Sequence, residues 1–321
     1  MFSFLARRMI TIFLPTLLGM SILVFGAMHL IPGSYVDVLL GVGQDISPEQ
    51  RQQIVSSYGL DQPVPVQYVK WLGNVVTGDF GTSLKSGKPV AGEILSRLPV
   101  TLELAVLATI TSLVLAIPAG IAAALYRGRW PDTVLRLVAL VGLSVPNFLI
   151  ATLLVLLVST QWKILPTTGF VPIGDGIWPN LKSLIMPTIS LGALLAASIM
   201  RMMRSSMLEE LSKEYLTVAR AKGLQQKSVV LGHALRNSLI PVITVVGIQT
   251  GYMLGGTVII EQVFAIPGIG RLALDAVNQR DYPLVQGTVM FIAGAFVFMN
   301  MVTDVVYGFV DPRIRVGGKS S

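Results

Sequence analysis

Residues 213–237 read KEYLTVARAKGLQQKSVVLGHALRN, a basic stretch that lies between two long apolar runs. Read as a helix that begins near residue 206, this region carries one apolar face, because four residues recur at i, i+3, i+7 and i+10. They are Leu208, Leu211, Tyr215 and Val218. Gly223 stands where a left-handed residue commonly ends a helix, and a second helical run is expected over 225–237. The pattern predicts a charged helical element that docks on something outside the membrane.

The composition is that of a membrane protein. Of the 321 residues, 53% are hydrophobic and 13% are charged, with a mean hydropathy of +0.70, whereas soluble domains carry about 25% charged residues. A helix needs about 20 apolar residues to cross the hydrocarbon layer. Six stretches without Asp, Glu, Lys or Arg come near or exceed this length: 9–36, 104–126, 137–162, 183–200, 237–260 and 282–303. The predicted fold class is an all-α membrane protein with six transmembrane helices.

The distribution of Lys and Arg predicts the orientation of these helices. Fifteen of the 24 Lys and Arg residues lie before the first stretch, between the second and third, between the fourth and fifth, or after the sixth. Because short loops rich in Lys and Arg stay in the cytoplasm, both termini are expected there. The net charge of +7 follows from this asymmetry, so nucleic acid is not needed as a partner. The first apolar stretch is longer than the core of a signal peptide and is expected to be a retained span.

The stretches divide the chain into one external segment and one membrane core. Residues 1–31 are expected to form the first transmembrane helix with a cytoplasmic N-terminus, and 312–321 a cytoplasmic tail. Residues 32–99 form a periplasmic segment with short helices, one near 47–58 and one near 67–76. Gly-rich and Pro-containing clusters at 78–81 and 87–89 predict turns in this segment. Residues 100–311 form a core of five transmembrane helices with a cytoplasmic loop at 201–236.

The sequence lacks the motifs of an enzyme or a metal site. The Gly-Lys-Ser at 318–320 is the nearest match to a phosphate-binding loop, but position 313, where its first glycine belongs, is Arg. There is no Cys, and His29 and His233 are predicted on opposite sides of the membrane, so they cannot share a metal. The stretches hold almost none of the ionisable residues that couple transport to ions. Asp304 is the main exception. The alternative to a role in ion coupling is that Asp304 pairs with an interfacial Arg or caps a neighbouring helix.

Residues 215–223, together with His233-Ala234-Leu235-Arg236-Asn237, resemble the peptide-permease form of the cytoplasmic EAA loop of bacterial ABC importers. Thr217, Val218 and Arg236 depart from the general pattern of that loop in the way typical of the peptide group. Other segments agree in order and position: FSFLARR at 2–8, GDFGTS at 78–83, PVTLEL at 99–104, RMMRSSML at 201–208, PGIGR at 267–271, RDYP at 280–283 and DPR at 311–313. The chain resembles, over nearly its whole length, the first of the two permease subunits in dipeptide, oligopeptide, glutathione and nickel importers.

The resemblance implies a type I ABC importer permease fold with no ATPase site of its own. In that family the helix before the Gly is a coupling helix, which seats in a groove of a cytosolic ATPase. ATP and Mg are then expected on two partner ATPase subunits, beside a second permease subunit and a periplasmic or lipid-anchored solute-binding protein. The expected coupling residues are Leu208, Leu211, Glu214, Tyr215, Val218, Ala219, Arg220 and Gly223. The alternative is a solvated helix held on anionic lipid by its Lys and Arg residues.

The solute path is expected between the two permeases, lined by the later spans. Candidate pathway residues are Gln249, Glu261, Asn300 and Asp304, with no cofactor or metal on this chain. The predicted function is that of a permease subunit for ATP-driven uptake of short peptides across the bacterial inner membrane. Nickel or another small solute is the alternative within the group. A passive channel or scaffold is a more distant one, because it would not need the charged loop at 201–236.

Overall fold

The computed structural model describes residues 8–30, 49, 52, 55–56 and 61–310. Within this part of the chain the structure is helical, and the one β-type pairing is the isolated bridge between Thr82 and Pro89. The all-α fold class is therefore confirmed. Residues 1–7 before the first expected span, the tail expected at 312–321 and most of the short helix expected near 47–58 lie outside the described residues.

Contacts divide the chain into two compact units, and the division falls inside the helices α6 (Val90–Leu125) and α14 (Tyr282–Val310). The first unit comprises residues 102–266 and the chain from residue 298 onward. Besides parts of α6 and α14 it holds α7 (Trp130–Ser144), α8 (Asn147–Leu154), η2 (Val155–Gln161), η3 (Ile173–Asp175), α9 (Ile177–Leu211), α10 (Glu214–Ala221), α11 (Gln226–Ser228), η4 (Val229–Ala234) and α12 (Leu235–Val263). The second comprises residues 2–101 and 267–297, with η1 (Met9–Phe13), α2 (Leu14–Leu30), α5 (Val64–Val76) and α13 (Ile269–Asn278).

Five helices among the described residues are long and apolar enough to cross a membrane: Met9–His29, Val90–Leu125, Ile177–Leu211, Gln226–Gln249 and Tyr282–Thr303. A sixth span is obtained when Trp130–Ser144 and Asn147–Gln161 are counted as one. This pair is bent by 107°, so the stretch at 137–162, which was expected to form one span, consists of two helices. The cause is Pro146, which disfavours the helical conformation of the residue before it. Val145 accordingly has φ −88° and ψ 125° and ends α7.

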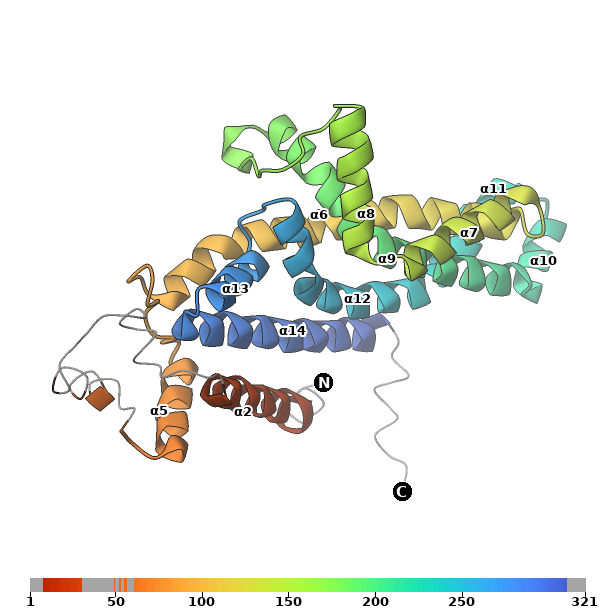
Figure 1. Cartoon of the computed structure of the whole chain (residues 1–321). Helices are drawn as coiled ribbons and strands as arrows, with labels where there is room; N and C mark the ends of the chain where they lie inside the picture. The colour runs from red at the N-terminus through yellow and green to blue at the C-terminus, as the bar shows by residue number, and fades with distance from the viewer. Residues whose placement is uncertain (1–7, 31–48, 50–51, 53–54, 57–60, 311–321) are drawn as a thin grey trace, which may run out of the picture. The chain divides into compact units, whose positions relative to one another are not determined.

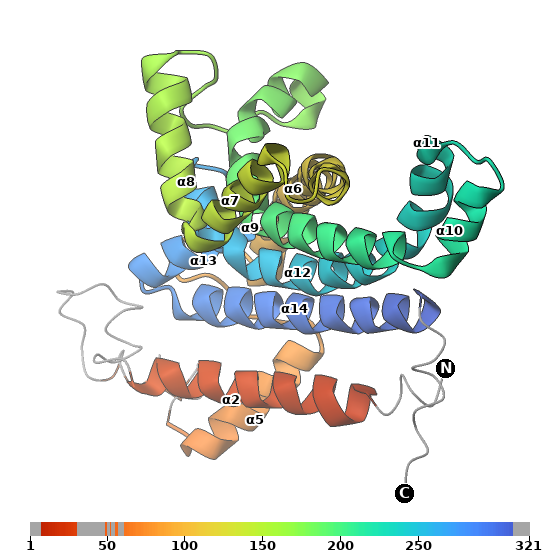
Figure 2. The same ribbon diagram turned by 90° about the vertical axis from the view of Figure 1, so that its right-hand side faces the viewer.

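In the first unit α9 is the central helix. Figure 2 shows α12 running alongside it, and α7 and α8 also pack against it. Small residues permit the close approach of helices that is typical of membrane interiors. Ser112 on α6 donates a hydrogen bond of 2.9 Å to the carbonyl of Gly192 on α9, and a Cβ atom at Gly192 would lie 2.5 Å from the Ser112 hydroxyl. Gly192 therefore permits the close contact between α6 and α9, and a larger residue at this position would force the two helices apart.

In the second unit, segments that are distant in sequence meet at Asp281, the residue before α14. Its buried carboxylate accepts hydrogen bonds from the Ser83 hydroxyl at 2.5 Å and from the backbone N–H groups of Leu84, Lys85 and Leu284. The Thr101 hydroxyl likewise accepts a 2.9 Å bond from the N–H of Ile269. The motifs at 78–83 and 280–283, and those at 99–104 and 267–271, thus hold each other in place.

One expected helix and the expected turns are present in this unit. The helix expected near 67–76 is α5, and its Tyr68 and Trp71 pack around Phe25 of α2 at ring distances of 5.4 and 5.5 Å. Gly78 and Gly81 have φ of +85° and +80°, as the turn cluster requires. His29 packs in the same unit, with Nδ1 lying 3.0 Å from the carbonyl oxygen of Phe25.

Candidate functional site

The charged segment after the fourth apolar stretch is two helices rather than one. α9 continues to Leu211, a turn follows at Ser212 and Lys213, and α10 begins at Glu214. The Ser212 hydroxyl donates a 2.7 Å hydrogen bond to the carbonyl of Glu209, and the Lys213 N–H bonds to the carbonyl of Glu210. These bonds satisfy carbonyls at the end of α9 and end the helix there. The expectation that Leu208, Leu211, Tyr215 and Val218 share one helix face was therefore wrong.

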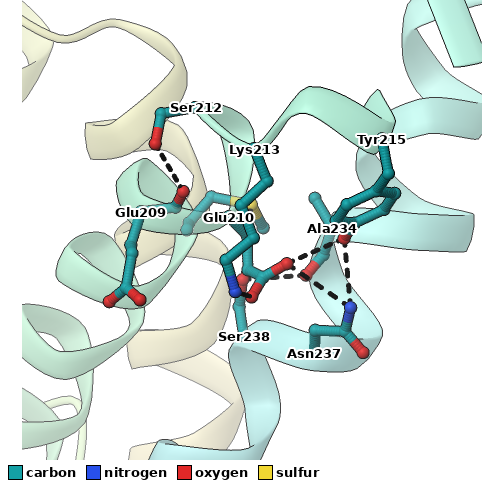
Figure 3. A network of polar contacts seen from close by, with 9 residues as sticks. Glu209, Glu210, Ser212, Lys213, Tyr215, Ala234, Asn237 and Ser238 are labelled. Atoms are coloured by element: carbon teal, nitrogen blue, oxygen red, sulfur yellow. Dashed lines mark hydrogen bonds and ion pairs between the residues drawn. The ribbon is translucent and has the colours of Figure 1, made fainter. Parts of the chain in front are cut away.

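A network of polar side chains holds α10 against its neighbours (Figure 3). Glu210, near the end of α9, is buried. Its carboxylate accepts hydrogen bonds from Lys213 Nζ, from the Tyr215 hydroxyl at 2.7 Å and from Asn237 Nδ2 at 3.4 Å. Asn237 also donates to the Tyr215 hydroxyl at 3.0 Å. The network joins α9, α10 and α12, and we call it the Glu210 network.

The electrostatics of the Glu210 network agree with its geometry. The hydrogen bond to Glu210 raises the pKa of Lys213, so the ammonium form is favoured. Burial, followed by the hydrogen bond to Glu210, raises the pKa of Tyr215 and keeps its hydroxyl protonated. The neutral phenol is the form that can donate a hydrogen bond to the carboxylate. Both shifts favour the protonation states that the network uses at neutral pH.

α10 turns one face inward and leaves the other open. Leu216 is fully buried, with 0% exposure, and packs into the first unit. Val218 is 54% exposed and Tyr215 is 42% exposed, although the hydroxyl of Tyr215 belongs to the Glu210 network. Glu214, at the start of α10, is exposed. We call the surface formed by Glu214, Tyr215 and Val218 the open face of α10.

The turn after α10 has the predicted conformation. Gly223 has a φ of +81°, the left-handed region that favours glycine. The segment beyond it is helical from Gln226 and continues through η4 and α12 without a break, so the expected second run is part of the next span. Figure 1 shows α10 and α11 together at one end of α9 and α12. Ala219 and Arg220 lie within α10, and their side chains are outside the described part of the structure.

Leu208 and Leu211 have a different environment from that of the open face. Both lie on the last turns of α9 and are half-buried. Leu208 follows the fully buried Met207, and Leu211 is the last residue of the helix. The two leucines therefore belong to the end of the spanning helix and to its packing.

A buried ion pair joins α7 to the same part of α9, and sequence reasoning did not find it. Asp132 is 2% exposed, and its two carboxylate oxygens accept hydrogen bonds from Arg204 Nε at 2.7 Å and Nη2 at 2.9 Å. The N–H of Gly128 donates a further bond of 3.0 Å to this carboxylate. Bidentate pairs of this kind are strong and geometrically specific. From the sequence, Arg204 was used as a charge that sets orientation and as part of the segment 201–208, and no spacing rule connects it with a residue 72 positions away.

The candidate pathway residues lie in different surroundings. Gln249 on α12 is half-buried, and its amide lies 3.5 Å from the Ser198 hydroxyl of α9. Glu261, near the end of α12, is fully buried with 0% exposure. Asn300 is half-buried on α14, and Asp304 lies on α14 with a side chain outside the described part. The structure does not bring these four residues to one described site, and their role in a pathway stays a prediction.

Gln249 borders an open groove between α9 and α12 in the first unit. The groove encloses about 520 Å³ and is lined by Ser198, Arg201, Met202, Ser205, Val245, Ile248 and Gln249. Among the described residues no group of three or more His, Cys, Asp or Glu side chains is placed to hold a metal ion. The described surface thus offers two features that could engage partners or solute, the open face of α10 and this groove.

Comparison with known proteins relates the chain to transport. Residues 116–316 match the family described as the inner membrane component of binding-protein-dependent transport systems. Residues 1–105 match the family for the N-terminal region of such membrane components.

Individual relatives match over nearly the whole chain. The dipeptide transport system permease protein DppB of Escherichia coli (strain K12) is 40% identical over 338 residues, which cover 98% of this chain and 99% of the relative. DppB of Alkalihalophilus pseudofirmus is 38% identical, with 97% and 98% covered. The glutathione transport system permease protein GsiC of Salmonella choleraesuis is 40% identical over 319 residues, with 98% and 99% covered.

Proposed function

We propose that this chain, which belongs to the family of inner membrane components of binding-protein-dependent transport systems, is the permease subunit of an ATP-driven importer of short peptides. The observation that carries the proposal is the near-full-length similarity to permeases named for dipeptide and glutathione transport. As a permease subunit it is not an enzyme. ATP and Mg belong to two separate ATPase subunits, and a second permease and a solute-binding protein complete the system.

α10 is the part of the chain that we assign to the ATPase contact. Its open face offers the aromatic ring of Tyr215 and the apolar side chain of Val218, with Glu214 beside them. A short helix with apolar residues and charges at its edge suits insertion into a groove. Arg220 would add a second charge at the edge. We place α10 on the cytoplasmic side because the loop at 201–236 is rich in Lys and Arg.

The Glu210 network supports this assignment because it makes α10 part of a larger rigid element. Movement of α10 by an ATPase would act on α9 through Glu210 and on α12 through Asn237. The left-handed Gly223 then returns the chain directly into the next spanning helix. We propose that these contacts convert closure of the ATPase pair into displacement of the spans that line the solute path. Leu208 and Leu211 would then contribute to packing at the end of α9 and would not enter the ATPase groove.

The first experiment identifies the assembly. The chain is purified with its membrane neighbours in mild detergent, and native mass spectrometry measures the masses and stoichiometry of the intact complex. One second permease and two ATPase subunits are expected. A lone chain or a homo-oligomer, under conditions that preserve a known importer in parallel, would contradict the proposal and favour a channel or scaffold.

The second experiment identifies the solute. The complete complex is placed in proteoliposomes with its binding protein, and ATP-dependent uptake of radiolabelled dipeptide, glutathione and Ni²⁺ is measured separately. Competition by tripeptides, glutathione and Ni²⁺ ranks the alternatives within the group. Uptake of dipeptide or glutathione is expected. ATP-dependent uptake of Ni²⁺ with no competition by peptides would replace the peptide assignment by the nickel alternative.

A further inference from the structure

Two arginines on α9 have opposite environments although they are three residues apart. Arg204 is neutralised by the buried carboxylate of Asp132. Arg201 is exposed, and in the part of the chain that the structure describes it forms no ion pair and no hydrogen bond. It directly follows the apolar stretch 183–200, at the edge of the hydrocarbon region. Cations close to the hydrocarbon region commonly face a partner or a water-filled cavity, and no described residue compensates the charge of Arg201.

Arg201 lines the groove between α9 and α12 together with several hydrogen-bonding side chains. The hydroxyls of Ser198 and Ser205 and the amide of Gln249 line the same groove. Apolar surface is supplied by Met202 and Ile248. A cation, two hydroxyls and an amide can hydrogen-bond the charged group of a small amphipathic anion. The apolar surface beside them can contact the rest of such a ligand. The volume of about 520 Å³ lies within the range of ligand sites, roughly 300–1,000 Å³.

We propose that this groove is a subsite for the terminal carboxylate of the transported peptide, with Arg201 as its anion-binding residue. The guanidinium presents N–H donors in a planar fork that matches a carboxylate. Ser198, Ser205 and Gln249 supply further donors, and the apolar side chains contact the C-terminal residue of the peptide. The inference rests on the proposed function and adds to it a specific requirement for a free carboxylate at the permease.

The test uses the complete transporter in lipid discs of zwitterionic lipid, without the binding protein, so that selection at that earlier step is removed. The probe is a dipeptide whose second residue carries a diazirine, prepared both as the free acid and as the C-terminal amide. After illumination, mass spectrometry maps and quantifies the labelled segments. We expect the free acid to label residues 198–205 or 245–249, and the amide to label them about tenfold less, because one charge-assisted hydrogen-bonded pair is lost.

Variants connect this preference to one side chain. Arg201→Gln should remove the preference for acid over amide, whereas Arg201→Lys should retain part of it through the remaining charge. Arg129→Gln is the matched control, because Arg129 is an exposed cation outside the groove, and it should keep the full preference. No partner in the described chain loses a contact when Arg201 changes, so assembly of the complex is expected to be normal for all variants.

Three outcomes would overturn the inference. The acid preference could survive in Arg201→Gln, or the label could lie wholly outside the groove. Alternatively, Arg201→Gln could lose a tightly bound phospholipid with no change in peptide labelling, which would assign the anion site to a lipid phosphate. Failure of the proposed function is distinguishable, since the wild-type system would then import no peptide when its binding protein is present.

Discussion

The change Tyr215→Phe tests whether the Glu210 network positions α10. The hydroxyl donates to the Glu210 carboxylate at 2.7 Å and accepts from Asn237 at 3.0 Å. A hydrogen bond to a charged group contributes about 1.5–3 kcal/mol and a neutral one about 0.5–1.5 kcal/mol. Because Tyr215 is 42% exposed, water can replace part of the loss, and the lower limits apply. Their sum is about 2 kcal/mol, which corresponds to about 30-fold in an equilibrium constant.

The phenylalanine ring keeps the apolar surface of the open face, so any effect comes from the lost positioning of α10. We expect the permease to bind its ATPase subunits about 10- to 30-fold more weakly, measured by titrating ATPase onto permease in lipid discs. Peptide uptake should fall in parallel, with normal membrane insertion. Tyr126→Phe is the matched control, because Tyr126 is 47% exposed and lies outside the network. Affinity and uptake within twofold of wild type for Tyr215→Phe would refute the positioning role.

Three further changes test neighbouring parts of the account. Val218→Asp places a carboxylate on the open face of α10 and should weaken ATPase binding about 100-fold or more, whereas the same change at the 78%-exposed Val76 of α5 should leave uptake intact. Gly223 has φ +81° with open space around it, so Gly223→Val should impair uptake through about 1–2 kcal/mol of backbone strain. Gly223→Asn should retain uptake, because asparagine tolerates this conformation. Equal uptake by the two variants would contradict the role of backbone strain. Asp132→Asn leaves Arg204 without its counter-charge and should cost roughly 3–5 kcal/mol of stability, read as a lower thermal inactivation temperature, and an unchanged temperature would show that the pair is dispensable.

Much of the membrane architecture could be predicted from the sequence because the apolar stretches are long and uninterrupted by charge. The third stretch shows the limit of that reasoning. Its apolar run from 137 to 162 is continuous, but Pro146 bends the helix pair by 107°. The amide geometry at Val145-Pro146 is local, so the break was predictable from the proline itself. Gly223 illustrates the favourable case, in which one residue type and its position gave the correct backbone conformation.

The end of α9 was not predictable in the same way. The apolar period from Leu208 to Val218 runs across Ser212 without interruption, and both serine and lysine occur within helices. The Ser212 and Lys213 bonds to the carbonyls of Glu209 and Glu210 end the helix. What orients α10 is the Glu210 network, which includes Asn237, 27 residues away from Glu210. The pairing of Arg204 with Asp132 is more distant still. Contacts of this kind depend on how helices pack, and no local periodicity encodes them.

The docking of α10 on an ATPase subunit is the central claim, and the absence of cysteine from the chain permits a direct measurement of it. Val218→Cys provides the only thiol of this chain, on the open face of α10. The purified variant is labelled with a maleimide-linked benzophenone and then assembled with its partner subunits in lipid. Illumination is predicted to join this chain to an ATPase subunit in high yield, and the same label at Val76→Cys should not do so. Labelling of lipid alone from position 218, with an assembled and active transporter, would contradict the account and assign α10 to the membrane surface.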